Sequence, residues 1–351
     1  MIVFFAPFPL EDEEKKRGLA QRIMAIDDLF SSRERVYLEV SYRKNWSAQK
    51  IQIDGKAYLY KLNAFIHFFS IIKILSKATV VYYHTVANGL KFLPYTYIPH
   101  LNRLKKICDM HGVLPEECIM DGSKYKYFMY KLVERLVLRD IDEIICVSEV
   151  MRDHYNIKYG KYNLNSIILP IYTTNVLTDL EKDTKVYNLN VIYAGGVQVW
   201  QNVGEMLELA RLNKDLNFEF WFPKQYAEKY RNLNLNDNIS FRTGSQIDVK
   251  DAYQNVSLGL ALRDTDAVNR VACPTKIVEY IENGVVPILK STEIGDFVNM
   301  GLKYLKISEL NGDQLNINLV EKYAKSNQEV FSRFCEIIQL GKKELIKSCR
   351  V

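Results

Sequence analysis

The residues best suited to chemistry lie in one run of the second half, PTKIVEYIENG, from Pro274 to Gly284. Proline suits the first turn of a helix and glycine suits its C-terminal cap, so the run predicts a helix over residues 276–282. Thr275 and Lys276 then stand at the helix start, where unpaired amides and the positive end of the dipole attract an anion. The run therefore predicts a phosphate site.

Glu279 follows Lys276 by three residues, so the two side chains share one face of the predicted helix. A cation for phosphate and a carboxylate for hydroxyl groups together suit a nucleotide sugar. The alternative is a local surface ion pair between the two side chains, worth roughly a few tenths of a kcal/mol.

A second signal is the sequence Tyr193-Ala194-Gly195-Gly196, in which a strand runs into two glycines and then a helix. Glycine lets the backbone approach a phosphate, and the next helix offers free amides. The run lacks the G-x-G-x-x-G dinucleotide fingerprint. An ordinary turn is the alternative.

Titratable groups in the first half form a weaker pattern. His111 stands two residues after Asp109, and His84 ends the apolar run VVYYH. A lone histidine at a strand end is more often structural than functional, so both interpretations stay open. Asp264-Thr265-Asp266 matches a metal-binding D-x-D pattern, but such short acidic matches are common, and we expect no metal site.

Short apolar strands alternate with helices along the chain, which is typical of parallel α/β layers. One helix is predicted over residues 59–75 and a strand over 79–84. The polar stretch 172–187 reads as a linker, and the last 30 or so residues read as amphipathic helix. Other predicted strands are 2–6, 36–40, 106–109, 143–147, 167–170, 190–194, 218–222, 239–242, 258–262, 286–289 and 304–307. Other predicted helices are 16–30, 124–138, 149–155, 203–212, 226–232 and 249–254.

The length of 351 residues suits two domains. We expect a Rossmann-like, acceptor-side domain over 1–175 and a donor domain over 176–325. Helices over 326–351 would then cross back to the first domain. Two such α/β domains face each other across a cleft that holds the ligand at the carboxyl ends of the strands.

Composition excludes several classes of protein. The chain is 48% hydrophobic and 25% charged, as in globular proteins, and its six cysteines form no C-x-x-C pair, so we expect a cytoplasmic protein. Residues 1–180 carry 25 Lys+Arg and 20 Asp+Glu, too small an excess for nucleic acid. That excess would suit the inner membrane surface or an anionic lipid-linked substrate, with ordinary solvated surface as the alternative. Lys73 and Lys77 interrupt the most apolar segment, so no membrane span is predicted, although the 59–75 helix could rest on a bilayer.

The run PTKIVEYIENGVVPI resembles the donor-binding signature of retaining glycosyltransferases of the group 1, or family 4, class, which have the GT-B fold. The resemblance implies that Thr275 and Lys276 bind the diphosphate and Glu279 the ribose. YAGG resembles the glycine loop that faces the diphosphate. The remaining likenesses are Arg242-Thr243-Gly244 for the base loop, Asp142–Ser148 for the end of the first domain, Cys108–Gly112 with Pro115–Glu117 beside the reacting sugar, and Gly18 for the loop that meets acceptor and phosphate.

The sequence departs from this pattern at three positions. Val271 stands where many members have a second glutamate, and Gly196 and Asn202 replace an arginine and a lysine. Because a diphosphate needs positive charge, Arg263 and Lys276 are the cations we expect to supply it. The segment 264–269 would then face the donor sugar, with Asn269 as a hydroxyl partner.

The resulting hypothesis is a hexosyltransferase-type glycosyltransferase for cell-surface polysaccharide. It would move a sugar from a nucleoside diphosphate to a hydroxyl of a lipid-linked glycan, with retention of configuration and without metal or cofactor. The expected catalytic residues are His111 and Asp109; the donor residues are Gly195, Gly196, Gly244, Arg263, Asn269, Pro274, Thr275, Lys276 and Glu279; the acceptor-side residues are Gly18 and His84. Alternatives are a non-hydrolysing epimerase and a non-catalytic nucleotide-sugar-binding partner in a glycan assembly complex.

Overall fold

The structure is a computed structural model that describes residues 1–351 except 16–17, 171–184, 232–235, 311–314 and 351. The chain folds into two compact units. Unit 1 comprises residues 1–174 with 337–351, and unit 2 comprises 175–336. The sequence predicts boundaries at 175 and 325, and most of its predicted linker lies outside the described residues. Each unit is described by itself.

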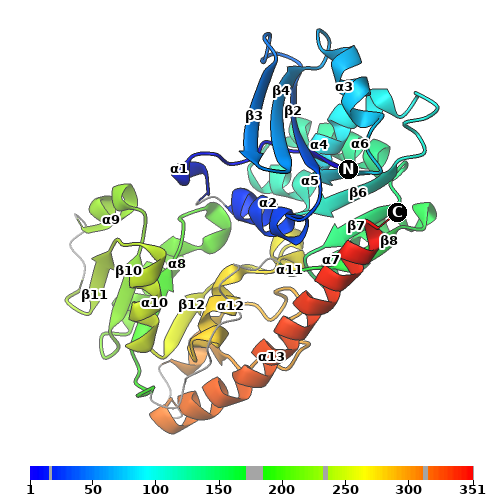
Figure 1. Ribbon diagram of the computed structural model, residues 1–351. Helices are drawn as coiled ribbons and strands as arrows, with labels where there is room; N and C mark the ends of the chain where they lie inside the picture. The colour runs from blue at the N-terminus through cyan, green and yellow to red at the C-terminus, as the bar shows by residue number, and fades with distance from the viewer. Residues whose placement is uncertain (16–17, 171–184, 232–235, 311–314, 351) are drawn as a thin grey trace. The chain divides into compact units, whose positions relative to one another are not determined.

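Unit 1 is built on an eight-stranded sheet with the order β3-β4-β2-β1-β5-β6-β7-β8, parallel except for β3 (Figure 1). Its central strands are buried on both faces, as parallel strands covered by helices must be. The strands are β1 (Ile2–Phe5), β2 (Arg35–Ser41), β3 (Gln49–Asp54), β4 (Ala57–Asn63), β5 (Val80–His84), β6 (Lys105–Met110), β7 (Glu143–Cys146) and β8 (Asn165–Ile168).

The helices of unit 1 follow the strands in the alternation that the sequence indicates. The predicted helix over 124–138 is confirmed residue for residue as α6 (Lys124–Leu138). The others are α1 (Asp12–Lys15), α2 (Gly18–Leu29), α3 (Phe68–Leu75), α4 (Val86–Phe92), α5 (Leu114–Met120) and α7 (Glu149–Tyr159).

The predicted helix over 59–75 is wrong in its first half. Residues 49–63 form a β-hairpin, and only α3 is helical. Half-buried and exposed side chains alternate along residues 51–54 of β3, buried and half-buried ones alternate along residues 57–60 of β4, and Gly55-Lys56 form the turn. The helix prediction begins too early because the apolar residues after the hairpin continue without a break from those of β4. Along residues 57–60 of β4 the buried side chains recur every two residues, as in a strand, and not every 3.6 residues, as in a helix.

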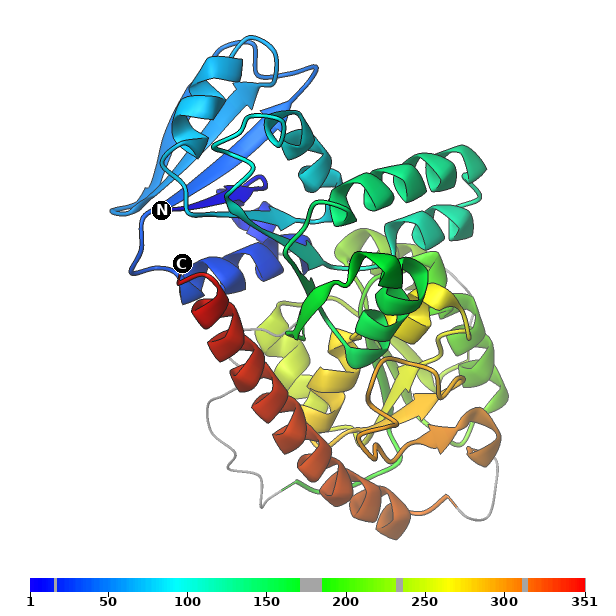
Figure 2. The ribbon, with the colours of Figure 1, turned by 90° about the vertical axis from the view of Figure 1, so that its right-hand side faces the viewer.

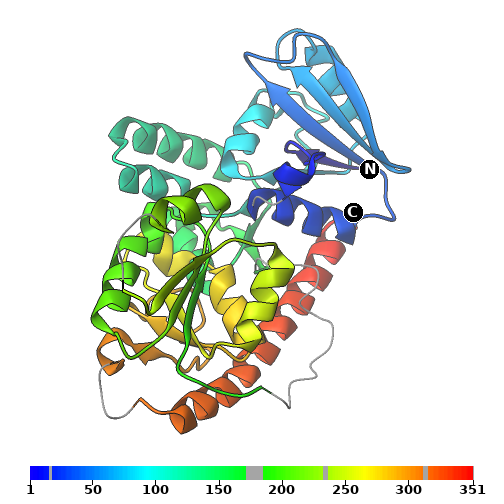
Figure 3. The same ribbon diagram turned by 90° about the vertical axis from the view of Figure 1, so that its left-hand side faces the viewer.

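Unit 2 contains a fully parallel six-stranded sheet with the order β11-β10-β9-β12-β13-β14 (Figure 3). The order reverses at β9, so right-handed crossovers place α8 and α9 on one face and α10 and α12 on the other. The strands are β9 (Val191–Ala194), β10 (Phe218–Trp221), β11 (Ile239–Arg242), β12 (Leu258–Ala261), β13 (Val286–Leu289) and β14 (Leu305–Lys306). The helices are α8 (Val203–Leu212), α9 (Lys224–Arg231), α10 (Gln246–Gln254), α11 (Ala267–Val271) and α12 (Thr275–Glu282).

The chain ends in one uninterrupted helix, α13 (Ile317–Ser348), where the sequence suggests several helices from 326 onward (Figure 2). Its first part belongs to unit 2, where Val320 and Ala324 join the core of that unit. Its last part belongs to unit 1, where the carbonyl oxygen of Ile168 leaves no room for a side chain at Gly341. Across the described ranges of the chain, no helix combines the length and apolar character that a bilayer crossing needs.

The packing of β12 against α12 depends on Gly259. A Cβ at this position would lie 2.6 Å from the ring of Tyr280, which is fully buried. We expect Gly259→Ala to destabilise unit 2 by about 1–3 kcal/mol through overpacking. Urea unfolding followed by the fluorescence of Trp200 and Trp221, which lie in this unit, measures the change.

The matched control is Gly204→Ala in α8, where nothing lies within 4 Å of the added methyl group. Alanine favours the helix there by up to about 1 kcal/mol. Equal unfolding midpoints for the two variants would contradict the packing argument.

Candidate functional site

The loop after β9 places a glycine against a lysine of α12. A Cβ on Gly195 would lie 3.5 Å from Cε of Lys276 and 2.8 Å from the Tyr193 hydroxyl. That hydroxyl donates to the carbonyl of Gly196 at 2.7 Å and holds the loop in place. The predicted glycine loop and the predicted phosphate cation are therefore neighbours in space.

Helix α12 begins one residue before the predicted start and ends where the sequence predicts. Pro274 is the N-cap and Thr275 the first helical residue, and the helix stops before Gly284, whose φ is +63°. The amides of Ile277 and Val278 bond back to the Pro274 carbonyl. Those of Thr275 and Lys276 precede the first intrahelical bond, so the helix end offers two donors and a positive dipole end.

The predicted face of α12 contains an ion pair. The Lys276 ammonium lies 2.7 Å from Oε2 of Glu279, and the Tyr253 hydroxyl donates to the same oxygen at 2.8 Å. Tyr253 is buried in α10, and sequence reasoning missed it because only the fold brings the two helices together. The ion pair of the alternative interpretation thus exists, and both groups stay partly exposed, at 23% and 32%.

Arg263 follows β12 and carries an under-compensated charge. Its side chain reaches Asn269 through a long hydrogen bond, 3.4 Å from Nη1 to Oδ1. Burial lowers the pKa of Arg263, against the opposing effects of Tyr193 and Asp266. A half-buried guanidinium with a long hydrogen bond to a neutral side chain favours binding of an anion.

Asn269 is predicted to bind a sugar hydroxyl, but the structure gives it a different task. Its side chain is fully buried, and Nδ2 donates to the Asp264 carbonyl at 3.1 Å and to Asp266 at 2.6 Å. Its Oδ1 faces Arg263. Asn269 therefore braces the loop and positions Arg263, and it presents no free group to a ligand.

Asp264, the first residue of the D-x-D sequence, is bound by a lysine and an asparagine of the protein itself. Lys290 lies 2.6 Å from Oδ1 of Asp264, and Asn202 donates to Oδ2 at 2.7 Å. These two hydrogen bonds lower the pKa of Asp264. Asp266 caps α11 by accepting from the Asn269 amide at 2.8 Å. Both carboxylates thus have structural duties.

The predicted base loop is tightly packed around Gly244. A Cβ there would lie 2.7 Å from the ring of Trp221 and 2.8 Å from Asp248. Ser245 then caps α10 in a capping box with Asp248. Only glycine fits this turn without moving the tryptophan.

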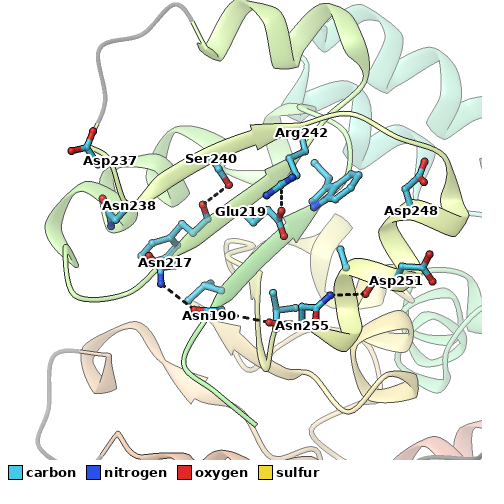
Figure 4. Close-up of a pocket in the computed structure, with 15 residues that line it drawn as sticks. Asn190, Asn217, Glu219, Asp237, Asn238, Ser240, Arg242, Asp248, Asp251 and Asn255 are labelled. Carbon is cyan, nitrogen blue, oxygen red and sulfur yellow. Dashed lines mark hydrogen bonds and ion pairs between the residues drawn. The ribbon is translucent and has the colours of Figure 1, made fainter. Parts of the chain in front are cut away.

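A hollow of about 610 Å³ opens on the β9–β10–β11 face of unit 2 (Figure 4). Its walls include Trp221 and the ion pair between Arg242 and Glu219. It extends to Asn190 and Asn217, which precede β9 and β10, and Arg242 of the predicted base loop is the one residue of the predicted donor region that lines it. Because open α/β sheets bind ligands at the carboxyl ends of their strands, we do not assign this hollow to the donor.

In unit 1, Asp109 is the centre of a buried polar cluster. Both of its oxygens accept from the Arg22 guanidinium, at 3.0 and 3.1 Å, and the Tyr82 hydroxyl donates to it at 2.9 Å. Burial alone would raise the pKa of Asp109, but Arg22, His111 and His84 hold it well below its usual range. Sequence reasoning missed Arg22, which reaches the cluster from α2.

The two histidines of this cluster differ in exposure. His84, beside Asp109 in the sheet register, is fully buried with its ring 3.6 Å from the carboxylate. The His111 side chain is 16% exposed, with Nε2 3.3 Å from Asp109. Of the three titratable groups predicted in unit 1, only His111 has a partly exposed side chain. Asp109 and His84 are fully buried, so neither side chain can contact a ligand directly.

His84, Asp109 and His111 are the one set of described side chains with ligand atoms close enough for a metal ion. The fit is poor, because Asp109 already gives both oxygens to Arg22. A metal ion bound to Asp109 would be repelled by the Arg22 guanidinium, which already binds the same carboxylate. The cluster therefore holds its own cation.

Thr85 borders this cluster, since its amide donates to the Asp109 carbonyl at 3.1 Å. Thr85, directly after His84, has φ +97° and ψ 150°, where a β-branched residue is strained by roughly 1–3 kcal/mol. Such strain gathers at functional sites, and no sequence signal marks it. Gly18 is the exposed first residue of α2, where a Cβ would meet nothing within 4 Å. Its neighbour Arg17 lies outside the described residues.

Comparison with known proteins gives a fold but no sequence relatives. No family model matches the chain, and no curated protein matches it. Anabaena HepE in complex with UDP superposes with a TM-score of 0.66 at 9% identity, covering 100% of both chains. An E. coli trehalose-6-phosphate protein bound with UDP-2-fluoro glucose gives 0.63 at 9%, covering 100% of this chain and 99% of the other.

A chain of the GtfA/B complex gives a TM-score of 0.58 at 12% identity. The match covers 83% of this protein but only 61% of that chain. The shared architecture of two parallel-sheet units is that of GT-B glycosyltransferases. The protein has the GT-B fold.

The buried His84 makes stability depend on pH. Burial lowers the pKa of His84 to about 4, below the ordinary value of about 6.5 that it regains on unfolding. Between these values the unfolded chain binds more protons, so the folding stability from neutral His84 is complete above about pH 6.5 and is lost as pH falls towards 4. We expect His84→Phe, which keeps a ring but cannot titrate, to remove up to about 3 kcal/mol of this change.

Urea unfolding of both proteins between about pH 4.5 and about pH 7 measures the difference, since the histidines outside this cluster contribute equally to each. Curves that stay parallel across this interval would show that His84 does not titrate as its burial requires.

Proposed function

We propose that the protein transfers a sugar from a nucleoside diphosphate sugar to a hydroxyl group of a glycan. The observation that carries the proposal is the convergence of Gly195, Lys276 and the free amides of α12 at one end of the unit 2 sheet. The GT-B fold agrees with this function, because two of the solved structures compared above were bound to UDP or a UDP-sugar analogue.

The chemistry proposed for unit 2 is electrostatic. Departure of a nucleoside diphosphate leaves negative charge, which the α12 amides, Lys276 and Arg263 stabilise. Lys276 would exchange its bond to Glu279 for the diphosphate and release that carboxylate to the ribose hydroxyls. Tyr253 would keep Glu279 oriented through this exchange.

We further propose His111 as the catalytic contact of unit 1, with Asp109 and Arg22 fixing its position. Retention of configuration, independence from metal and cofactor, hexosyl transfer and a lipid-linked acceptor in cell-surface polysaccharide synthesis belong to the same proposal. They rest on the resemblance of the run PTKIVEYIENGVVPI to the donor-binding signature of retaining group 1, or family 4, glycosyltransferases. The family's second glutamate is replaced by Val271, whose apolar side chain is buried.

The first test is a thermal-shift panel of UDP-, GDP-, ADP-, CMP- and dTDP-sugars, with and without magnesium. A ligand that binds only the folded state raises the unfolding temperature with its concentration. We expect the sugars of one nucleotide to stabilise the protein without magnesium, and UDP is the first candidate. If none of the sugars shifts the transition, the donor proposal is overturned.

Acceptor assays then separate the remaining functions. Sugar transfer that requires an acceptor supports the proposal. An altered nucleotide sugar formed without acceptor identifies an epimerase, and donor that is bound but stays intact with every acceptor identifies a non-catalytic binding partner.

Glu279 gives the sharpest single-residue test. We expect Glu279→Ala to weaken binding of the preferred donor by about 1.5–3 kcal/mol, or roughly 10–150-fold, because it removes a charged hydrogen-bond partner. Tyr253→Phe, which removes one hydroxyl, should cost about fivefold. Isothermal calorimetry measures both.

Glu228→Ala is the matched control, since this glutamate is exposed on α9 of the same unit. It should bind donor like the parent protein. Parent-like affinity in Glu279→Ala would remove Glu279 from the donor site.

A further inference from the structure

One exposed face of α6 is unusual for a helix at a protein surface. Its large apolar side chains point outward, with Tyr125 75%, Phe128 67% and Leu132 56% exposed. Met129 and Leu136 are also exposed. At 100° per residue these five side chains form one narrow stripe, about 16 Å long. We call it the α6 stripe.

The opposite face of α6 is buried, which fixes the direction of the stripe. Glu134 is 1% exposed and accepts from the hydroxyls of Tyr155 and Tyr159 at 3.0 and 2.7 Å. The Lys158 ammonium lies 2.6 Å from the same carboxylate. Val133, Val137 and Leu138 are buried beside it. The helix cannot turn its stripe inward without breaking this network.

Within α6 the exposed charged side chains all have one sign. The flanks of the stripe carry Lys124, Lys126, Lys131, Arg135 and Arg139, whereas the one acidic residue of the helix is the buried Glu134. A row of cations with no acidic neighbour on the exposed side of its helix favours a negatively charged partner. An apolar strip bordered by such cations fits a surface that offers both hydrocarbon and negative charge.

We infer that the α6 stripe docks the protein on an anionic lipid bilayer. The helix would lie flat with Phe128 and Leu132 at the level of the acyl chains, while the lysines and arginines reach the phosphates. A second copy of this chain is a poor alternative occupant, because two such faces would oppose five cations to five cations.

The stripe is a better docking surface than the apolar residues around α3, which belong to the segment that could rest on a bilayer by its sequence. Phe65, Ile66 and Phe69 are exposed there. Within α3 itself, however, Lys73 is the only charged residue. The α3 patch therefore lacks the row of cations, and it serves as a matched control. The inference does not depend on the donor site of unit 2.

Co-sedimentation of the full chain with vesicles tests the inference. Vesicles of phosphatidylcholine alone are compared with mixtures of phosphatidylcholine and phosphatidylglycerol, at low and high salt. We expect at least about tenfold tighter partitioning to the anionic vesicles, weakened by salt.

The double variant Phe128→Gln with Leu132→Gln should reduce partitioning to the anionic vesicles at least about tenfold. Lys124→Gln, Lys126→Gln and Arg135→Gln should each reduce it roughly fivefold.

The control variant carries Ile66→Gln and Phe69→Gln, and it should partition like the parent. Thermal unfolding shows that each variant is folded, which the exposure of the substituted apolar side chains favours. The inference is overturned if the parent does not bind anionic vesicles, if the α6 variants bind as well as the parent, or if the α3 variant loses as much. Nucleotide-sugar thermal shifts on the same preparations report separately on the donor site.

Discussion

Parallel pairing of the strands is the constraint on which both site regions depend, because it brings their carboxyl ends to one edge of each sheet. In unit 2 this edge holds Gly195 after β9 and Arg263 after β12. In unit 1 it holds His84 and Asp109, which lie side by side in the register of β5 and β6. Backbone amides are free at such an edge, since helices begin there.

The two units treat buried charge in opposite ways. Asp109 is fully compensated, with Arg22 on both oxygens and Tyr82 on one, and this makes it a structural centre that positions its neighbours. Arg263 makes a long bond to Asn269, although burial disfavours its charge. The imbalance at Arg263 is the physical reason why we propose unit 2, rather than unit 1, for the anionic part of the donor.

The α6 helix meets two demands on opposite faces. Its inner face binds α7 through Glu134 and Tyr155, and the hydroxyl of Tyr155 also lies 3.0 Å from the carbonyl of Gly112, next to His111. Its outer face carries the apolar stripe. One rigid set of contacts therefore joins the proposed membrane surface to the loop that holds the proposed catalytic histidine.

The sequence by itself determined most of the fold, because period and caps are local properties. It predicted α6 to the residue and the start of α12 to within one residue, and it found the strands of both sheets apart from β3 and β4. It failed at residues 49–63, where apolar residues beyond the hairpin obscured a period of two. It also identified Lys276 and Glu279 as neighbours, since three residues on a helix fix their distance.

Only the tertiary structure decided which partners these residues have. Arg22 lies 87 residues from Asp109 and Tyr253 lies 26 from Glu279, and no local pattern encodes either contact. Packing likewise buried His84 and Asn269, which the sequence offers to ligands. The outward direction of the α6 stripe was decided in the same way, because an amphipathic pattern names two faces and only the contacts of Glu134 show which one is inside.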